Sequence, residues 1–132
     1  MSINHFFSTK IQRWYSKHKR DLPWRQNNDP YRIWLSEVIL QQTRVVYGES
    51  YFKRFTSTFP TIYDLANAPE DQVLKLWQGL GYYSRARNLH KTAKLITNEF
   101  NGVFPNDYKL LLSLPGIGPY TAAAISSICF HL

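Results

Sequence analysis

The chain has 132 residues, of which 44% are hydrophobic and 19% charged, a composition typical of one folded domain rather than a disordered segment. No apolar run approaches the roughly 20 residues that span a bilayer, and the N-terminus lacks a signal-peptide pattern, so we expect a cytoplasmic protein without a membrane partner. The single cysteine, Cys129, excludes an internal disulfide and an all-cysteine metal site within these residues.

The net charge of +7 is unevenly distributed along the chain. Residues 1–54 hold ten basic and four acidic residues, and residues 72–98 hold five basic residues and no acidic one. Segregation of this kind favours a polyanionic partner, nucleic acid before membrane. A solvated basic surface is an equally good interpretation of the charge alone.

Apolar residues recur at helical spacing along nearly the whole chain, and no segment alternates as a strand would. In the first half we expect an amphipathic helix within residues 1–21 and a second helix from Pro30 to about Tyr47. A third helix ends at Pro60, and a short one capped by Thr61 runs through Ala66.

The second half continues in the same way, with proline and glycine as helix boundaries. One helix follows Pro69 and closes at Gly79, and another runs from Arg85 to Phe100. Asn106 is expected to cap a short helix that contains residues 110–112, and a last helix runs from Tyr120 to about His131. The predicted fold class is all-α.

The segment LPGIGPYTAAAI, residues 114–125, is the most specific motif. Gly116 and Gly118 allow positive φ and close backbone approach, and the N–H groups around Ile117 and Gly118 are expected to point outward as an anion site. No Lys-Ser/Thr pair follows the glycines, which excludes a nucleotide P-loop. A plain inter-helix turn is the alternative. With its flanking helices the segment resembles a helix-hairpin-helix, which holds the DNA backbone without reading sequence.

Glu37 lies in IWLSEVILQQT, among large apolar residues and with no Lys or Arg one helical turn away. A helix salt bridge is therefore not its purpose. An apolar pocket raises the pKa of a carboxyl group and leaves it a proton to donate near neutral pH. The alternative interpretation is a glutamate that extends to solvent.

Five motifs together resemble the adenine DNA glycosylases of the MutY type, within the helix-hairpin-helix glycosylase superfamily and related to endonuclease III. In chain order they are LPWR (22–25), WLSEVILQQT (34–43), DLANAP (64–69), LWQGLGYYSRARNLH (76–90) and LPGIGPYTAAAI (114–125). The resemblance implies a six-helix barrel over residues 22–132, with the helix-hairpin-helix at about 107–131. The helix within residues 1–21 would pack on a further domain holding a [4Fe–4S] cluster. Because the chain ends before the family's cluster region, we expect an N-terminal portion that binds no cofactor within residues 1–132.

The resemblance also implies a function, namely a monofunctional glycosylase of base excision repair. It would remove adenine mispaired with 8-oxoguanine or guanine after flipping the base out of double-stranded DNA. Such a protein is expected to be a monomer that acts on the bacterial chromosome.

The same resemblance assigns roles to individual residues. Glu37 would be the general acid, and Tyr120 stands where bifunctional relatives carry a lysine, so it cannot form their Schiff base and would instead hydrogen-bond near the sugar. Further residues would contact DNA or the flipped adenine: Gln42 and Tyr82 as wedges in the duplex, Gly116, Ile117 and Gly118 on the backbone, and Trp24, Arg25 and Leu40 around adenine and its strand. Arg85, Arg87 and His90 are either phosphate contacts or residues of the helix surface.

Two other functions stay open. The family's second catalytic carboxylate would lie beyond Leu132, and glycosidic cleavage usually needs two carboxylates, so the chain alone could be a catalytically inactive, non-specific DNA-binding module. A bifunctional, endonuclease III-like glycosylase is the less favoured third possibility.

Overall fold

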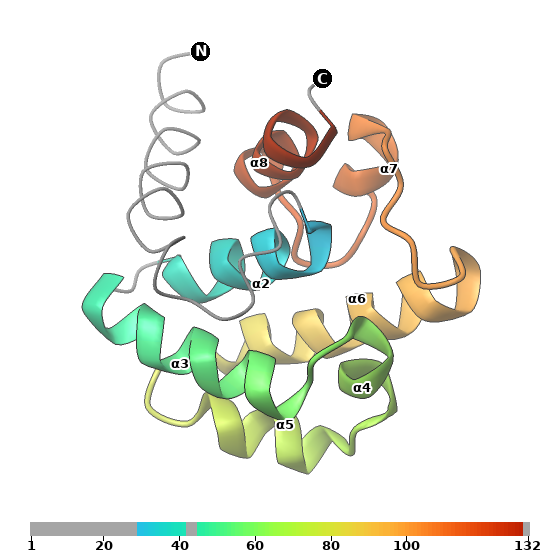
Figure 1. Ribbon diagram of the computed structural model, residues 1–132. Coiled ribbons are helices and arrows are strands. Elements are labelled where there is room, and N and C mark those ends of the chain that lie inside the picture. The colour runs from blue at the N-terminus through green and yellow to red at the C-terminus, as the bar shows by residue number, and fades with distance from the viewer. Residues whose placement is uncertain (1–28, 42–44, 131–132) are drawn as a thin grey trace.

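A computed structural model describes residues 29–41 and 45–130, and within these residues it contains seven helices and no strand (Figure 1). The all-α prediction is confirmed, whereas the helix expected within residues 1–21 lies outside the described residues. The helices are α2 (Pro30–Leu40), α3 (Val45–Thr58), α4 (Ile62–Asn67), α5 (Glu70–Trp77), α6 (Tyr83–Glu99), α7 (Tyr108–Leu112) and α8 (Pro119–Phe130). None of these helices is long and apolar enough to cross a membrane.

Helix α2 lies at the centre of the molecule. In Figure 1 helices α7 and α8 lie on one side of it and α3 to α6 on the other, and α2 packs directly against α8 and α3. Pro30 occupies its first turn, and the Asp29 carboxylate caps it by accepting a hydrogen bond from the Tyr31 N–H at 3.1 Å. Nine of its eleven residues are buried, which explains why its sequence is apolar on almost every side.

The expectation that this helix reaches Tyr47 is wrong. Helix α2 ends at Leu40, because Gln41 adopts an extended conformation with ψ 119°, and Tyr47 belongs to α3. The side chain of Arg85, far along the chain on α6, donates hydrogen bonds to carbonyl groups at this end of α2. The end of α2 is therefore stabilised by a tertiary contact that could not be predicted from the sequence around Leu40.

Two short helices show how closely local signals fixed the helix starts. Thr61 caps α4 as predicted, and it forms a capping box in which its hydroxyl accepts from the Asp64 N–H at 3.3 Å. The cap of α7 is Asp107 rather than the predicted Asn106. The Asp107 carboxylate accepts from the N–H of Leu110 at 3.1 Å, and a carboxylate is also favoured by the positive end of the helix dipole.

Helix α6 begins at Tyr83, two residues before the predicted start, and ends at Glu99. Gly102, with φ 78°, ends it as predicted, and its N–H donates to the Ile96 carbonyl at 2.9 Å. Helix α6 packs against α4 and α5.

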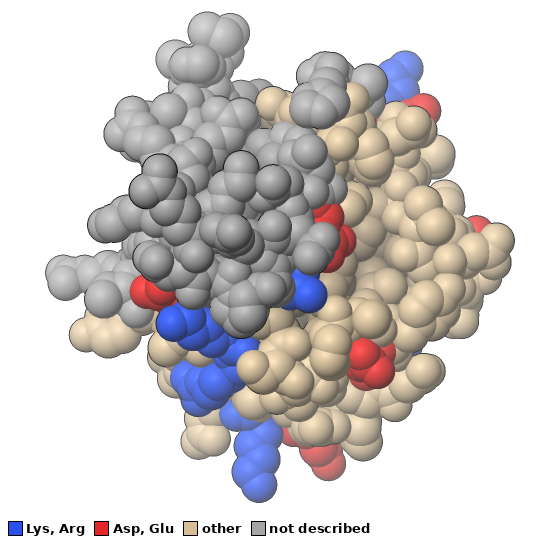
Figure 2. Space-filling view, viewed as in Figure 1, with Lys and Arg blue, Asp and Glu red and all other residues tan. Residues whose placement is uncertain are grey.

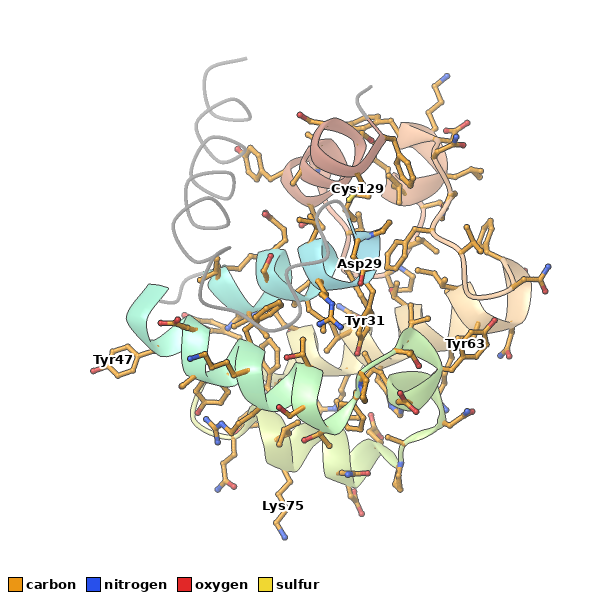
Figure 3. The ribbon with its side chains drawn as sticks, in the orientation of Figure 1. Asp29, Tyr31, Tyr47, Tyr63, Lys75 and Cys129 are labelled. Atoms are coloured by element: carbon orange, nitrogen blue, oxygen red, sulfur yellow. The ribbon has the colours of Figure 1, made fainter. Side chains whose placement is uncertain are left out.

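Aromatic rings fill the core on both sides of α2. Trp34 of α2 lies 5.4 Å from Phe104, and Phe55 of α3 meets the edge of Trp77 of α5 at 6.0 Å. Tyr31 points inward (Figure 3), and its hydroxyl donates to the Phe59 carbonyl at 2.6 Å. Burial raises the pKa of Tyr31, so the ring remains neutral there.

Candidate active site and nucleic-acid interface

Glu37 is the one acidic residue that the described part of the chain buries, with 3% of its surface exposed. Its neighbours one turn away on α2 include Ile33, Trp34 and Leu40, all of which are buried. The alternative that Glu37 extends to solvent is therefore wrong. A carboxyl group is rarely placed in such an environment for stability alone, because removing its charge from water is costly.

Tyr120 lies in the first turn of α8, the helix that packs against α2. The two helices are also joined where the predicted site lies, since the Gln41 side-chain amide donates to the Thr121 hydroxyl at 3.4 Å. Glu37 is one turn before Gln41, and Tyr120 is next to Thr121. The structure thus brings the two predicted catalytic residues onto adjoining helices.

Of the other residues predicted to contact adenine or its strand, the structure describes only Leu40. Leu40 is buried with 5% exposure, and it faces α3, because a Cβ on Gly48 would lie 2.6 Å from its Cδ2 atom. Trp24, Arg25 and Gln42 lie outside the described residues.

The hairpin between α7 and α8 differs in detail from the predicted anion site. Gly116 has φ 77°, as predicted, but Gly118 is not in the left-handed region, and a Cβ placed on it would have no atom within 4 Å. The N–H of Ile117 donates to the Leu114 carbonyl at 3.1 Å and its side chain is buried, so this N–H serves the turn itself. The Gly118 carbonyl accepts a hydrogen bond from the Ala122 N–H at 2.9 Å, so Gly118 caps the N-terminus of α8.

The open space beside Gly118 is the feature of this hairpin that bears on anion binding. The first N–H groups of an α-helix have no partner within the helix, and they attract anions with the help of the helix dipole. A glycine that is needed neither for its φ angle nor for packing leaves these groups open to close approach by a phosphate. An anion that approached this hairpin would therefore meet Gly118 and the first turn of α8.

Tyr82 protrudes from the turn between α5 and α6. Its side chain is 66% exposed, and its backbone is in the left-handed region, with φ 52°. A non-glycine residue in this conformation is uncommon and costs backbone energy, which the rest of the turn has to offset. The turn is held from behind, because the Trp77 indole N–H donates to the Gly81 carbonyl at 2.9 Å and the Tyr51 hydroxyl donates to the Gln78 carbonyl at 2.5 Å.

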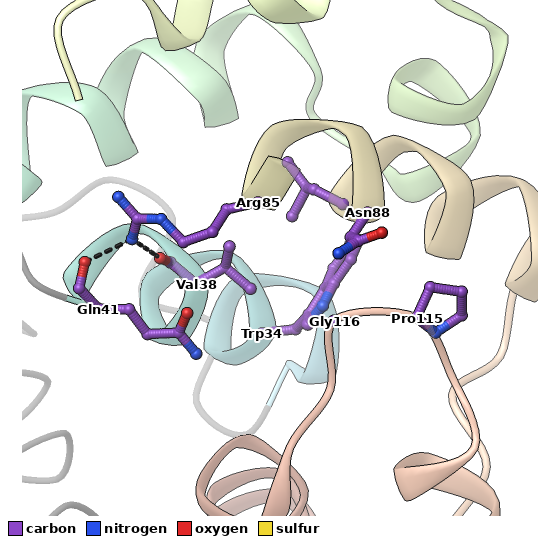
Figure 4. Close-up of a pocket in the computed structure, with 8 residues that line it drawn as sticks. Trp34, Val38, Gln41, Arg85, Asn88, Pro115 and Gly116 are labelled. Carbon is purple, nitrogen blue, oxygen red and sulfur yellow. Dashed lines mark hydrogen bonds between the residues drawn. The ribbon is translucent and has the colours of Figure 1, made fainter. Parts of the chain in front are cut away.

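A pocket of about 170 Å³ lies between α2, α6 and the hairpin (Figure 4). Neither Glu37 nor Tyr120 lines it, so it is separate from the predicted catalytic residues. Sequence reasoning missed the pocket, since nothing local indicates that Arg85 and Asn88, three residues apart on one face of α6, point inward. Its lining residues are Trp34, Val38, Gln41, Arg85, Asn88, Leu89, Pro115 and Gly116.

The sequence left the roles of Arg85, Arg87 and His90 undecided between phosphate contact and helix surface, and on α6 these three side chains differ in exposure. Arg87 is exposed, as a surface residue would be, whereas Arg85 is half-buried and His90 is only 5% exposed. Burial lowers the pKa of both Arg85 and His90, and the neighbouring charge of Lys94 lowers that of His90 further. His90 is therefore a core residue rather than a phosphate contact.

Basic side chains gather over α3 and α5 on the face shown in Figure 2. These helices carry the exposed residues Lys53, Arg54 and Lys75, and the Arg54 guanidinium lies 4.2 Å from the centre of the Tyr51 ring.

No group of three or more His, Cys, Asp or Glu side chains among the described residues could hold a metal ion.

Comparison with known proteins places the chain in a family. The profile of the HhH-GPD superfamily of base excision DNA repair proteins matches residues 35–124. The chain belongs to this superfamily.

Several relatives are named adenine DNA glycosylase. The protein from Buchnera aphidicola subsp. Baizongia pistaciae is 46% identical over 127 residues, which cover 96% of this chain and 36% of that protein. The rat protein is 43% identical and the human protein 42% identical, each over 94% of this chain, covering 26% and 24% of those proteins. This chain thus spans about a third or less of the length of these relatives.

Solved structures agree on the fold. A thermostable thymine-DNA glycosylase matches 97% of this chain and 59% of its own, with 29% sequence identity and a TM-score of 0.75. Endonuclease III, in a trapped covalent intermediate with DNA, matches 94% of this chain and 61% of its own, with 22% identity and a TM-score of 0.73. The described helices therefore have the arrangement of endonuclease III-like glycosylases.

Proposed function

We propose that this chain supplies the glycosylase barrel of a monofunctional adenine DNA glycosylase. Its substrate would be double-stranded DNA in which adenine is mispaired with 8-oxoguanine or guanine. The observation that carries the proposal is the burial of Glu37, 3% exposed, on the central helix that packs against α8. The names of relatives that cover 94 to 96% of this chain support the choice of adenine.

In the proposed reaction the adenine nucleotide is first flipped out of the duplex. Apolar surroundings disfavour a carboxylate anion, which suits Glu37 to donate a proton to a ring nitrogen of the departing base. The bond between the sugar and adenine then breaks, and its electron pair leaves with the protonated base. Water adds to the resulting sugar cation and loses a proton, while the Tyr120 hydroxyl hydrogen-bonds near the sugar.

The remaining residues would open and hold the duplex. Tyr82, exposed on its turn, and Gln42 would enter the base stack, and Gly118 with the first turn of α8 would bind a phosphate. The proposed contacts of Trp24, Arg25 and Leu40 with adenine and its strand follow from the family resemblance. A [4Fe–4S] cluster takes four cysteine ligands, and Cys129 alone does not fit it, so no step involves a cluster.

A second function is favoured by one observation. The other acidic residues of the described part of the chain are exposed or half-buried, so none of them stands beside Glu37 as a second buried carboxylate. Because glycosidic cleavage usually employs two carboxylates, these 132 residues on their own could act as a non-specific DNA-binding module.

Single-turnover release of adenine separates the two functions. The chain would be mixed in excess with a duplex that holds one adenine opposite 8-oxoguanine, beside the variant Glu37→Gln and the matched surface variant Glu99→Gln. Release by the chain and by Glu99→Gln, but not by Glu37→Gln, supports the glycosylase. Equal turnover by Glu37→Gln would contradict the general-acid role. Binding without release supports the DNA-binding module.

Borohydride trapping tests the remaining alternative. A bifunctional enzyme forms a Schiff base with the sugar, which borohydride reduces to a stable protein–DNA adduct. Tyr120 offers no amine, so we expect no adduct with this chain. An adduct would show that a lysine elsewhere reaches the sugar.

A further inference from the structure

Arg85, in the first turn of α6, contacts the end of α2. Its Nη1 atom donates to the Val38 carbonyl at 2.9 Å and also to the carbonyl of Gln41 (Figure 4). The last carbonyl groups of a helix have no partner within the helix, so the guanidinium acts as a C-terminal cap from another element. Gln41 leaves the helical conformation at this point. Arg85 thus stabilises the end of α2.

The same residue contacts the turn that carries Tyr82. The backbone N–H of Arg85 donates to the Tyr82 carbonyl at 2.9 Å, and its guanidinium lies 5.8 Å from the centre of the Tyr82 ring. The guanidinium also lies 5.0 Å from the centre of the Trp77 ring, whose indole holds the same turn. One side chain therefore connects two segments that are separated by about 40 residues in the sequence.

The guanidinium of Arg85 contacts groups within the protein rather than pointing into solvent. It is half-buried, and its Nη1 hydrogen bonds go to backbone carbonyls. Arg87, two residues later on α6, is exposed to solvent. A lysine could not replace Arg85 fully, because an ammonium group lacks the flat guanidinium that lies near the Trp77 and Tyr82 rings while it donates to the carbonyls.

We propose that Arg85 is a positioning residue for opening the duplex, which holds the turn of Tyr82 in a fixed relation to the end of α2 at Gln41. This inference rests on the proposed function, in which Tyr82 enters the base stack. A turn that is already held in place before binding lets Tyr82 enter the stack without a separate ordering step. In this proposal Arg85 acts through the turn of Tyr82, without a contact of its own to a phosphate or to the reacting base.

The test measures base unstacking directly. The adenine analogue 2-aminopurine, placed beside an adenine·8-oxoguanine pair, becomes more fluorescent when its neighbours are unstacked. The fluorescence rise at saturating protein would be compared for the chain, Arg85→Lys, Arg85→Met, the matched control Arg87→Lys and the wedge variant Tyr82→Ala. We expect Arg85→Lys and Arg85→Met to lower the unstacking equilibrium constant about tenfold, as the loss of a hydrogen bond to a charged group does, and Arg87→Lys to leave it unchanged.

Two further readouts separate positioning from other roles. If Arg85 acts through the wedge, the double variant Arg85→Lys/Tyr82→Ala should unstack no less than Tyr82→Ala alone. The salt dependence of binding should be the same for Arg85→Met as for the chain, whereas loss of a phosphate contact lowers the slope by about 0.9. Should Arg85→Met fail to fold, Arg85→Lys still carries the comparison.

Several results would overturn the inference. They are additive losses in the double variant, a reduced salt slope, a lowered melting temperature with unchanged unstacking, or the absence of any unstacking by the unaltered chain. Unstacking by the chain without release of adenine would instead contradict the proposed catalysis and leave the positioning role intact.

Discussion

Gly116 of the hairpin lies directly against Asn88 of α6, so that a Cβ on Gly116 would come within 2.9 Å of the Asn88 Cβ. The φ angle of 77° at Gly116 adds backbone strain for any other residue. Gly116→Ala is therefore expected to lower the free energy of unfolding by about 2 kcal/mol. Urea denaturation of the two proteins measures this difference, and an unchanged midpoint would show that the hairpin can move away from α6.

Gly118, two residues later, should behave in the opposite way. Its Cβ would meet no atom within 4 Å, and asparagine is as good a helix cap as glycine or better, so Gly118→Asn should leave stability unchanged. The added side chain would occupy the space in which we expect a phosphate, and duplex affinity should fall about tenfold. Titration of matched and mismatched duplexes checks the prediction. A loss confined to the mismatched duplex would argue against a backbone contact.

The hydroxyl of Tyr51 supports the turn that leads to Tyr82. Tyr51→Phe removes the 2.5 Å hydrogen bond to the Gln78 carbonyl and should cost about 1 kcal/mol of stability. Tyr47 is a matched control, because its ring is 61% exposed and points away from the protein (Figure 3), so Tyr47→Phe should cost nothing. Chemical denaturation of both variants provides the comparison. Equal effects would mean that the hydroxyl of Tyr51 is not a support.

His90 should make the stability depend on pH. Its pKa is lowered in the folded protein, mainly by burial and then by Lys94, despite the opposing effects of the Ala68 carbonyl and Glu70. The unfolded chain, with a histidine pKa of about 6.5, therefore binds more protons than the folded protein below that pH. The free energy of unfolding should fall as the pH is lowered from 7.5 towards 5.5. His90→Gln should flatten this dependence, and an unchanged slope in that variant would assign it to other groups.

Cys129 should react slowly with thiol reagents. Burial raises the pKa of this thiol to about 12, so hardly any thiolate is present at pH 8. Modification by a chromogenic disulfide should be at least about a hundredfold slower in the folded protein than in urea. The rate should rise with pH until the thiol ionises. A folded-state rate close to that in urea would show that the thiol is accessible and ordinary.

Several helix ends could be predicted from the sequence because their signals are local. Thr61 caps α4 through Asp64, three residues away, and Gly102 closes α6 by a bond to Ile96. Glu37 could likewise be singled out, since its apolar neighbours and the lack of a nearby basic residue are visible within one helical turn.

Other features could not be predicted because their causes are distant in sequence. The end of α2 depends on Arg85, which follows Gln41 by 44 residues. The inward face of α6 at Asn88 depends on the approach of Gly116. Glycine permits positive φ but does not demand it, so the sequence could not reveal that Gly118 adopts an ordinary φ angle.

The turn bearing Tyr82 is braced by Trp77 and Tyr51 before any partner arrives. If that turn is rigid, the work of deformation during binding falls on the nucleic acid rather than on the protein. Discrimination would then begin before any chemical step, since a helix weakened by a mispair is cheaper to open than an intact one. The protein would then distinguish base pairs by how easily the duplex deforms. A mispair would open on binding, whereas a matched pair would stay stacked.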